Sequence, residues 1–275
     1  MKTDAHQHFW KYSPETHPWI SSQMVDIKRD FFPSDLGPIL KNNGFDGCVA
    51  VQADQSERET DFLLDLAAKN DFIKGVVGWV DLRAGNLKER LEHYKTFHKL
   101  KGFRHVVQDE EDDNFIIQES FINGVRALRD FDLTYDILIY PRHLAPTKKF
   151  LEALPDQKFV IDHIAKPFIK NGIIDPWEKE IRALAKFPNV FCKVSGMVTE
   201  AEWKAWTFDD FKKYLDVVYD AFGVDRLMFG SDWPVCLLSA TYSEVVGIVE
   251  EHCAGFSINE KEKLFGGNCN HFYDL

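Results

Sequence analysis

The chain has 275 residues, a formal net charge of −11 and a hydrophobic fraction of 45%, which is enough for one large core. No apolar run approaches the ~18 residues of a membrane span. Nucleic acid is bound through clustered Lys and Arg, which an acidic chain does not favour. We therefore expect neither a membrane nor a nucleic acid as partner, and the length fits a single domain over residues 1–275.

The cysteines indicate a reducing compartment. They are odd in number and far apart, without the paired spacing of a zinc site or a disulfide framework. The first residues also contain no basic segment followed by an apolar stretch, so we expect no secretory signal. We expect a cytoplasmic protein with reduced thiols at Cys48, Cys192, Cys236, Cys253 and Cys269.

Short apolar, β-branched runs alternate with amphipathic stretches along the whole chain. The runs predict strands over residues 3–8, 47–52, 75–80, 101–104, 134–139, 159–163, 190–194 and 227–230. Apolar residues at helical spacing predict helices between them, over 57–69, 87–99, 121–131, 146–154, 177–187 and 214–222. Eight such βα units without a linker predict an α/β fold, the (β/α)8 TIM barrel. An open doubly wound sheet is the alternative, but the Gly-rich phosphate turn of a dinucleotide site is missing after the first strand.

Two connections are longer than such a barrel needs. Residues 9–33 follow the first predicted strand and residues 196–208 follow the seventh, and both are rich in Trp, Pro and charged residues. Long loops in a compact domain are usually functional lids or disordered insertions, and the Trp content favours lids.

Polar side chains at the first and last strands predict a catalytic site. His6 and His8 are two residues apart, so in a strand they share one face. Such a pair can hold a divalent metal or present two N–H donors, although a surface His-x-His is the alternative. Asp232 follows an apolar strand and Gly230, which suits a general base at the barrel rim; capping the next helix is its other reading.

Other strand ends carry further candidates. His163 is either a third histidine of the cluster or a hydrogen-bonded core residue, and Arg104 and His105 either clamp substrate or, for Arg104, pair with an acidic loop. The tryptophans are either sugar-stacking faces or core aromatics. The candidates for substrate binding are Arg104, His105, Tyr140, Arg142, Lys166, Trp10, Trp79 and Trp233.

Five segments together resemble the amidohydrolase superfamily, in its amidohydrolase-related branch of sugar-lactone hydrolases of the L-fuconolactonase and L-rhamnonolactonase type. They are Asp4-Ala-His6-Gln-His8-Phe-Trp10, Gly75-Val-Val-Gly-Trp79-Val-Asp81, Asp162-His163-Ile-Ala-Lys166-Pro167, Phe229-Gly-Ser-Asp232-Trp-Pro234 and Gly267-Asn-Cys-Asn-His271-Phe-Tyr273. The resemblance spans the whole chain and implies that His6, His8, His163 and Asp232 line the active site.

The chain departs from the binuclear members of this superfamily. Those members carry a carboxylated lysine on the fourth strand and a histidine on the fifth. Here the fourth strand ends in Arg104-His105 with Lys101 at its start, and the fifth ends at Tyr140, three residues before His143. The resemblance therefore implies one divalent ion, zinc in the first place, or none. Its ligands would be His6, His8, His163 and Asp232.

We predict a hydrolase that opens a sugar-derived aldonolactone. Asp232 would take a proton from the attacking water, and His6, His8 and His163 would stabilise the oxyanion directly or through one zinc ion. The first alternative is a non-oxidative decarboxylase of the same branch, which Tyr140 disfavours because those enzymes usually carry histidine there. A sugar-acid-binding barrel without turnover is the second. The expected partner is a small sugar lactone, and a homodimer is left open.

Overall fold

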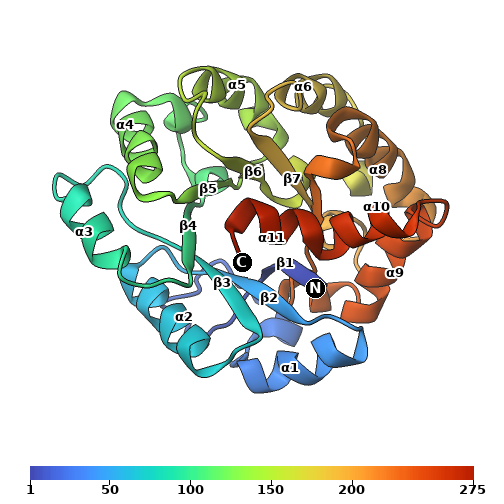
Figure 1. Ribbon diagram of the computed structural model, residues 1–275. Helices are drawn as coiled ribbons and strands as arrows, with labels where there is room; N and C mark the ends of the chain where they lie inside the picture. The colour runs from blue at the N-terminus through green and yellow to red at the C-terminus, as the bar shows by residue number, and fades with distance from the viewer.

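The computed structural model describes residues 1–275 and contains one eight-stranded parallel sheet in the order β1 to β8 (Figure 1). The sheet closes between its first and last strands, where the Asp232 amide donates to the His6 carbonyl at 2.8 Å and the His8 amide donates to the Trp233 carbonyl at 2.7 Å. This confirms the predicted (β/α)8 barrel. The strands are β1 Thr3–Gln7, β2 Gly47–Val51, β3 Ile73–Gly78, β4 Leu100–His105, β5 Thr134–Ile137, β6 Phe159–Ile161, β7 Val190–Val194 and β8 Leu227–Phe229.

Helices surround the barrel and cover the outer face of the strands (Figure 1). They are α1 Pro33–Asn42, α2 Glu57–Lys69, α3 Leu87–Tyr94, α4 Glu119–Leu128, α5 Leu144–Glu152, α6 Trp177–Leu184, α7 Met197–Glu200, α8 Phe208–Phe222, α9 Tyr242–His252, α10 Ile258–Glu262 and α11 Asn268–Tyr273. None of them combines the length and the apolar character that crossing a bilayer requires.

Side-chain hydrogen bonds explain two of the differences from the predicted boundaries. β3 ends at Gly78 rather than residue 80, because the hydroxyl of Thr60 both accepts from the amide of Trp79 and donates to its carbonyl. α8 begins at Phe208, six residues before the predicted start. There the Asp210 carboxylate accepts from the Thr207 amide at 2.7 Å and forms a capping box.

The two long connections are packed rather than open. The first folds back on itself through an antiparallel bridge between Trp10 and Phe31, both fully buried. The second contains the short helix α7. Both start at the carboxyl ends of strands, the end at which barrel enzymes carry their active sites.

The opposite end of the barrel is closed by the C-terminal helix α11, which lies across it in Figure 1. Inside the barrel an apolar layer that includes Val77, Val160 and Met228 packs against Phe272 and Tyr273 of this helix. The hydroxyl of Tyr273 reaches past that layer and donates to Asp136 Oδ2 at 2.8 Å. All five cysteines are buried and unpaired.

Candidate active site

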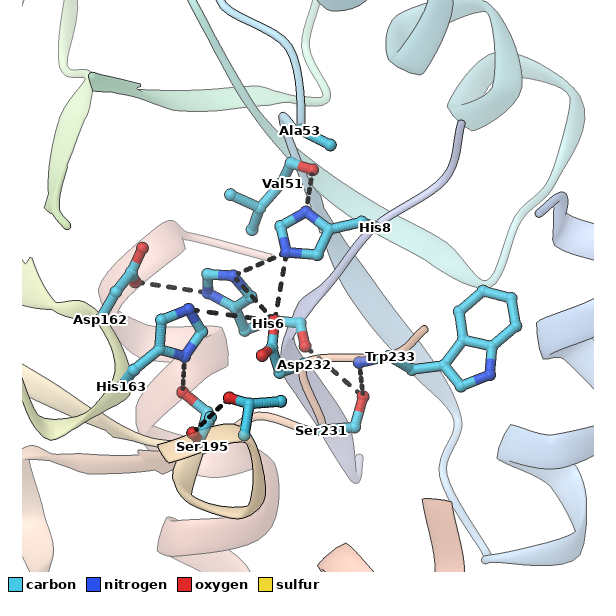
Figure 2. A network of polar contacts seen from close by, with 12 residues as sticks. His6, His8, Val51, Ala53, Asp162, His163, Ser195, Ser231, Asp232 and Trp233 are labelled. Carbon is cyan, nitrogen blue, oxygen red and sulfur yellow. Dashed lines mark hydrogen bonds and ion pairs between the residues drawn. The ribbon is translucent and has the colours of Figure 1, made fainter. Parts of the chain in front are cut away.

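His6 of β1 and His8, which directly follows this strand, converge at the carboxyl end of the barrel (Figure 2). Their Nε2 atoms lie 3.2 Å apart, as the shared face of a strand predicts. His8 Nδ1 lies 2.8 Å from the carbonyl oxygen of Val51 at the end of β2. A carbonyl only accepts, so His8 carries a proton on Nδ1, and in the uncharged form of the ring Nε2 presents its lone pair to the site.

Asp232 completes the site from the other edge of the closed sheet. It follows Gly230, where a Cβ would lie 2.7 Å from that of His6, so only glycine allows β8 to approach β1 this closely. The carboxylate Oδ1 lies 3.3 Å from His8 Nε2, 3.9 Å from His163 Nε2 and 4.0 Å from His6 Nε2. The sequence prediction of this four-residue grouping therefore agrees with the geometry. No side chain caps the turn at Val235–Leu238, so the capping reading of Asp232 finds no support.

The charges at this site suit a base surrounded by neutral rings. Burial alone would raise the pKa of Asp232, but His163, His8 and Lys166 outweigh it and hold the pKa below its ordinary value. Burial lowers the pKa of His163 to about 4 and that of His6 well below its usual range. At neutral pH the carboxylate is ionised and both of these rings are uncharged.

His163 reaches the site through an unusual turn after β6. Four consecutive non-glycine residues, from His163 to Lys166, have positive φ values between 47° and 58°. Each such residue costs roughly 1–2 kcal/mol. The turn is held by hydrogen bonds from the Trp177 indole to the Ile164 carbonyl and from the Lys166 amide to the His163 carbonyl, both 2.8 Å. Strain concentrated in this way is typical of functional sites. Here it brings the His163 imidazole and the Lys166 amine to the same cavity.

Beneath the imidazoles lies a group of buried charges that we call the interior ion cluster: Arg104 on β4, Asp136 on β5, Asp162 after β6 and Lys193 on β7. Asp162 Oδ2 accepts from Arg104 Nη1 at 2.9 Å, and Asp162 Oδ1 lies 3.0 Å from Lys193 Nζ. Lys193 Nζ also lies 2.5 Å from Asp136 Oδ2. All four side chains are at most 4% exposed, so each charge depends on its partners.

The cluster is ionised. Burial opposes the charge on Asp162, but Lys193, His6 and Arg104 hold its pKa well below the ordinary value. Burial likewise opposes the charge on Lys193, but Asp136 and Asp162 raise its pKa. The sequence reasoning singled out Arg104 and missed Asp136 and Asp162 as site residues. Their signal was a carboxylate within or directly after an otherwise apolar strand.

A cavity of about 280 Å³ opens above the cluster. This is near the lower end of small-molecule sites, about 300–1,000 Å³, and suits a ligand of monosaccharide size. Five predicted residues line it, namely His8, Arg104, His163, Lys166 and Asp232. The sequence reasoning missed other wall residues, among them Thr16 and Trp19 of the first long connection, Gln52 at the end of β2, and Asp54 and Gln108.

Six predicted substrate-binding residues do not line this cavity. Trp10 and Trp233 are at most 1% exposed and pack against Phe31, so they are core aromatics that offer no stacking face. The Trp of the cavity wall is the half-buried Trp19 instead. The remaining four, which lie behind or beside the wall, are Trp79, His105, Tyr140 and Arg142.

These four are engaged with protein partners. Trp79 Nε1 donates to His105 Nδ1, and His105 Nε2 lies 2.6 Å from Glu110 Oε1. Arg142 Nε donates to Asp113 at 2.8 Å, which is the acidic-loop pairing that had been weighed for Arg104. For Tyr140 and Arg142 the physical reason is local, because the chain after β5 enters the helical turn Pro141–His143.

The ligand set fits one divalent ion. Donor atoms of His6, His8 and Asp232 lie within 4.8 Å of one another. A second possible ligand group consists of His6, Asp162 and His163. Its Asp162, however, already pairs with Arg104 and Lys193. The position of a bridging lysine on β4 is taken by Arg104, while Lys101 donates to the Asp274 carbonyl at the closed end of the barrel. A two-metal centre therefore finds no bridging ligand here.

Glu59 of α2 supports the cavity wall, and its titration tests how strongly burial shifts the pKa of a carboxyl group in this protein. Its side chain accepts from the Ala53 amide at 3.1 Å, and burial raises its pKa from 4.5 to about 8. A raised folded pKa stabilises the protein below pH 4.5, and this contribution is lost as the pH rises through about 8. Glu59→Gln is therefore expected to increase the free energy of unfolding by at least about 1 kcal/mol at pH 9, with little change at pH 5.

Urea unfolding at the two pH values measures this effect. The exposed Glu152, which pairs only with Lys148, provides the matched control Glu152→Gln. An equal change at pH 5 and pH 9 for Glu59→Gln would show that the buried carboxyl is not the cause.

A (β/α)8 barrel with two histidines on its first strand and an aspartate after its eighth defines a class of barrel enzymes that activate water at the carboxyl ends of the strands. Residues 3–275 match the family described as amidohydrolase. The chain belongs to the amidohydrolase family, as the sequence motifs predicted.

Individual relatives give a more specific comparison than the family. The L-fucono-1,5-lactonase of Burkholderia multivorans is 40% identical over an alignment of 286 residues, which covers 100% of this chain and 96% of that protein. A crystal structure of an amidohydrolase from Burkholderia multivorans with bound zinc has a TM-score of 0.96 at 40% identity, covering 100% of this chain and 99% of that one. A dihydroxybenzoic acid decarboxylase from Polaromonas sp. JS666 has a TM-score of 0.71 at 12% identity, and the match covers 100% of this chain and 97% of that one. That last likeness is one of fold alone.

Proposed function

We propose that this protein hydrolyses a neutral, sugar-derived lactone. The observation that carries the proposal is an ionised Asp232 within 4.0 Å of three imidazoles, at the base of a monosaccharide-sized cavity. The full-length similarity to an L-fucono-1,5-lactonase supports this substrate class. An activated ester needs little assistance to its leaving group, so one carboxylate base with electrostatic help is a sufficient set of groups.

In the proposed reaction Asp232 accepts a proton from water, and the water oxygen attacks the lactone carbonyl. Negative charge then develops on the carbonyl oxygen. The groups that would stabilise it are His163 Nε2 and the guanidinium of Arg104, which line the cavity, with His6 Nε2 behind them. As the tetrahedral species collapses, the ring C–O bond breaks and the ring oxygen takes the proton that Asp232 accepted from water. The product is the open hydroxy acid.

Lys166 is the remaining candidate for holding substrate. Its amine lines the cavity, lies 3.5 Å from Glu200 and sits 5.4 Å from the ring centre of Tyr140. A fixed ammonium at this point suits a ring hydroxyl or the carboxylate of the product. Trp19 is the aromatic wall available for the ring itself.

A single divalent ion, zinc in the first place, would be held by His6, His8, His163 and Asp232. When bound it would supply Lewis-acid polarisation of the carbonyl oxygen. His8 fits this role, because its Nδ1–H is bound to the Val51 carbonyl and its Nε2 is free to ligate.

The two other functions considered have less support. A decarboxylase of this branch would usually carry histidine at the end of β5, where this chain has Tyr140. A binding module has no need of an ionised base beside three imidazoles, and Asp232 supplies one.

We expect a screen of sugar lactones to find cleavage of L-fucono-, L-rhamnono-, D-galactono- or D-mannono-lactone in preference to a pyrone dicarboxylate. A doubly charged ligand would require several fixed guanidinium groups. Only Arg104 lines the cavity, together with the acidic Asp54 and Asp109. Proton release followed with a pH indicator, before and after chelation, measures cleavage and any dependence on metal. Exclusive cleavage of the dicarboxylate, or no cleavage of any lactone, would contradict the proposal.

A further inference from the structure

Lys193 contacts one of the site imidazoles directly, and the proposed reaction leaves that contact unused. Its ammonium lies 2.5 Å from Asp136, 3.0 Å from Asp162 and 3.1 Å from His6 Nδ1. The side chain is completely buried, and the two carboxylates keep it charged. Three N–H bonds therefore face three neighbours, one of which is the imidazole.

This contact favours one of the two tautomers of His6. An ammonium donates and cannot accept, so His6 Nδ1 accepts from Lys193 when the proton lies on Nε2, although Nε2–H then faces Arg104 Nη1 at 3.2 Å. Nε2 faces His8 Nε2 at 3.2 Å. Because His8 carries its own proton on Nδ1, toward Val51, its Nε2 accepts from His6.

The other tautomer of His6 has a different use. With the proton on Nδ1, the ring would donate to Asp162 Oδ1 at 3.3 Å and Nε2 would accept from Arg104 Nη1 at 3.2 Å. However, Nδ1–H would then face the ammonium of Lys193, and the Nε2 lone pairs of His6 and His8 would face each other. Two facing lone pairs suit a cation between the rings, and a carboxylate behind the ring is the usual support of a metal-binding histidine.

We propose that Lys193 is a positioning residue that holds His6 in the Nε2–H tautomer. It thereby directs an N–H donor toward His8 at the base of the cavity and weakens binding of a divalent ion at His6 and His8. Neither consequence depends on the proposed lactone hydrolysis. Asp162 and Lys193 compete for the Nδ1 atom of His6. The balance between them determines whether Nε2 of His6 donates a hydrogen bond or is free to bind a metal ion.

The test uses Lys193→Met, which keeps the length of the side chain and removes the charge. Two-bond ¹H–¹⁵N spectra of histidine-labelled, metal-free protein report the tautomer of His6, whose signals are assigned by their loss in His6→Gln. We expect Nε2–H in the parent and Nδ1–H in Lys193→Met. Zinc affinity, measured by chelator competition, should increase at least about tenfold in the variant, the scale typical of groups supporting a ligand.

Tyr273→Phe is the matched control. It removes a hydrogen bond to Asp136 from the far side of the interior ion cluster without touching His6, so both the tautomer and the zinc affinity should stay as in the parent. If Lys193→Met does not fold, Lys193→Met/Asp136→Asn restores the charge balance and is judged by the same two measurements.

An Nδ1–H tautomer in the parent, or a variant in which either the tautomer or the zinc affinity is unchanged, would overturn the proposal. Neither measurement uses a lactone. A protein that fails the lactone screen but shows both changes would therefore refute the proposed function and keep the role of Lys193.

Discussion

Asp232→Asn is expected to lower kcat at least about a hundredfold while the protein remains folded, because the amide keeps the shape of the side chain and cannot accept a proton from water. The amide can still accept hydrogen bonds, so KM should change much less than kcat. Initial rates with the best lactone of the screen, together with circular dichroism, measure both quantities.

Asp113→Asn is the control for this substitution. Asp113 is a half-exposed carboxylate that pairs with Arg142 outside the cavity, so its amide should leave kcat within a few-fold of the parent. Near-normal turnover in Asp232→Asn would assign the base to another group and remove the observation that carries the proposed function.

Asp162→Asn is expected to cause the largest loss of stability. Asp162 is fully buried between Arg104 and Lys193. Without its negative charge, these two buried cations have only the carboxylate of Asp136 as a counterion. Removing one partner of a buried ion pair typically costs about 3–5 kcal/mol. For a chain of this size the melting temperature should fall by roughly 10 °C.

The matched control is Asp156→Asn, which breaks the exposed pair between Asp156 and Arg129. Surface pairs of this kind contribute little, so a change within about 0.5 kcal/mol is expected. Thermal and urea unfolding of the two variants at neutral pH measure the difference. Equal effects would mean that the interior ion cluster is compensated by groups other than Asp162.

These two predictions depend on different kinds of information. Asp232, His6, His8 and His163 could be identified from the sequence, because each lies within or just after a predicted strand, and the shared direction of His6 and His8 follows from the strand period of two. Once eight βα units are recognised, closure of the barrel requires the first and last strands to be neighbours. The histidine pair and the aspartate then face each other without any further assumption.

The tryptophans show where this local reasoning stops. Trp10 and Trp233 stand close to strand ends, as the four proposed catalytic residues do, yet both are buried against Phe31. Whether an aromatic side chain at a strand end faces a ligand or a neighbouring loop depends on how residues 9–33 fold back. That packing is decided by contacts between residues distant in the chain, so Trp19 lines the cavity in their place.

The sequence alone determined the barrel, the end of it that carries the candidate site and the four residues that converge there, because strand periodicity and the order of the βα units leave little freedom in these features. Tertiary structure alone decided the interior ion cluster, the left-handed turn from His163 to Lys166 and the contact of Lys193 with His6. Each of these joins groups from several strands or places residues in a backbone conformation they rarely adopt. The energy that maintains them comes from burial and charge pairing across the barrel, which no local pattern in the chain encodes.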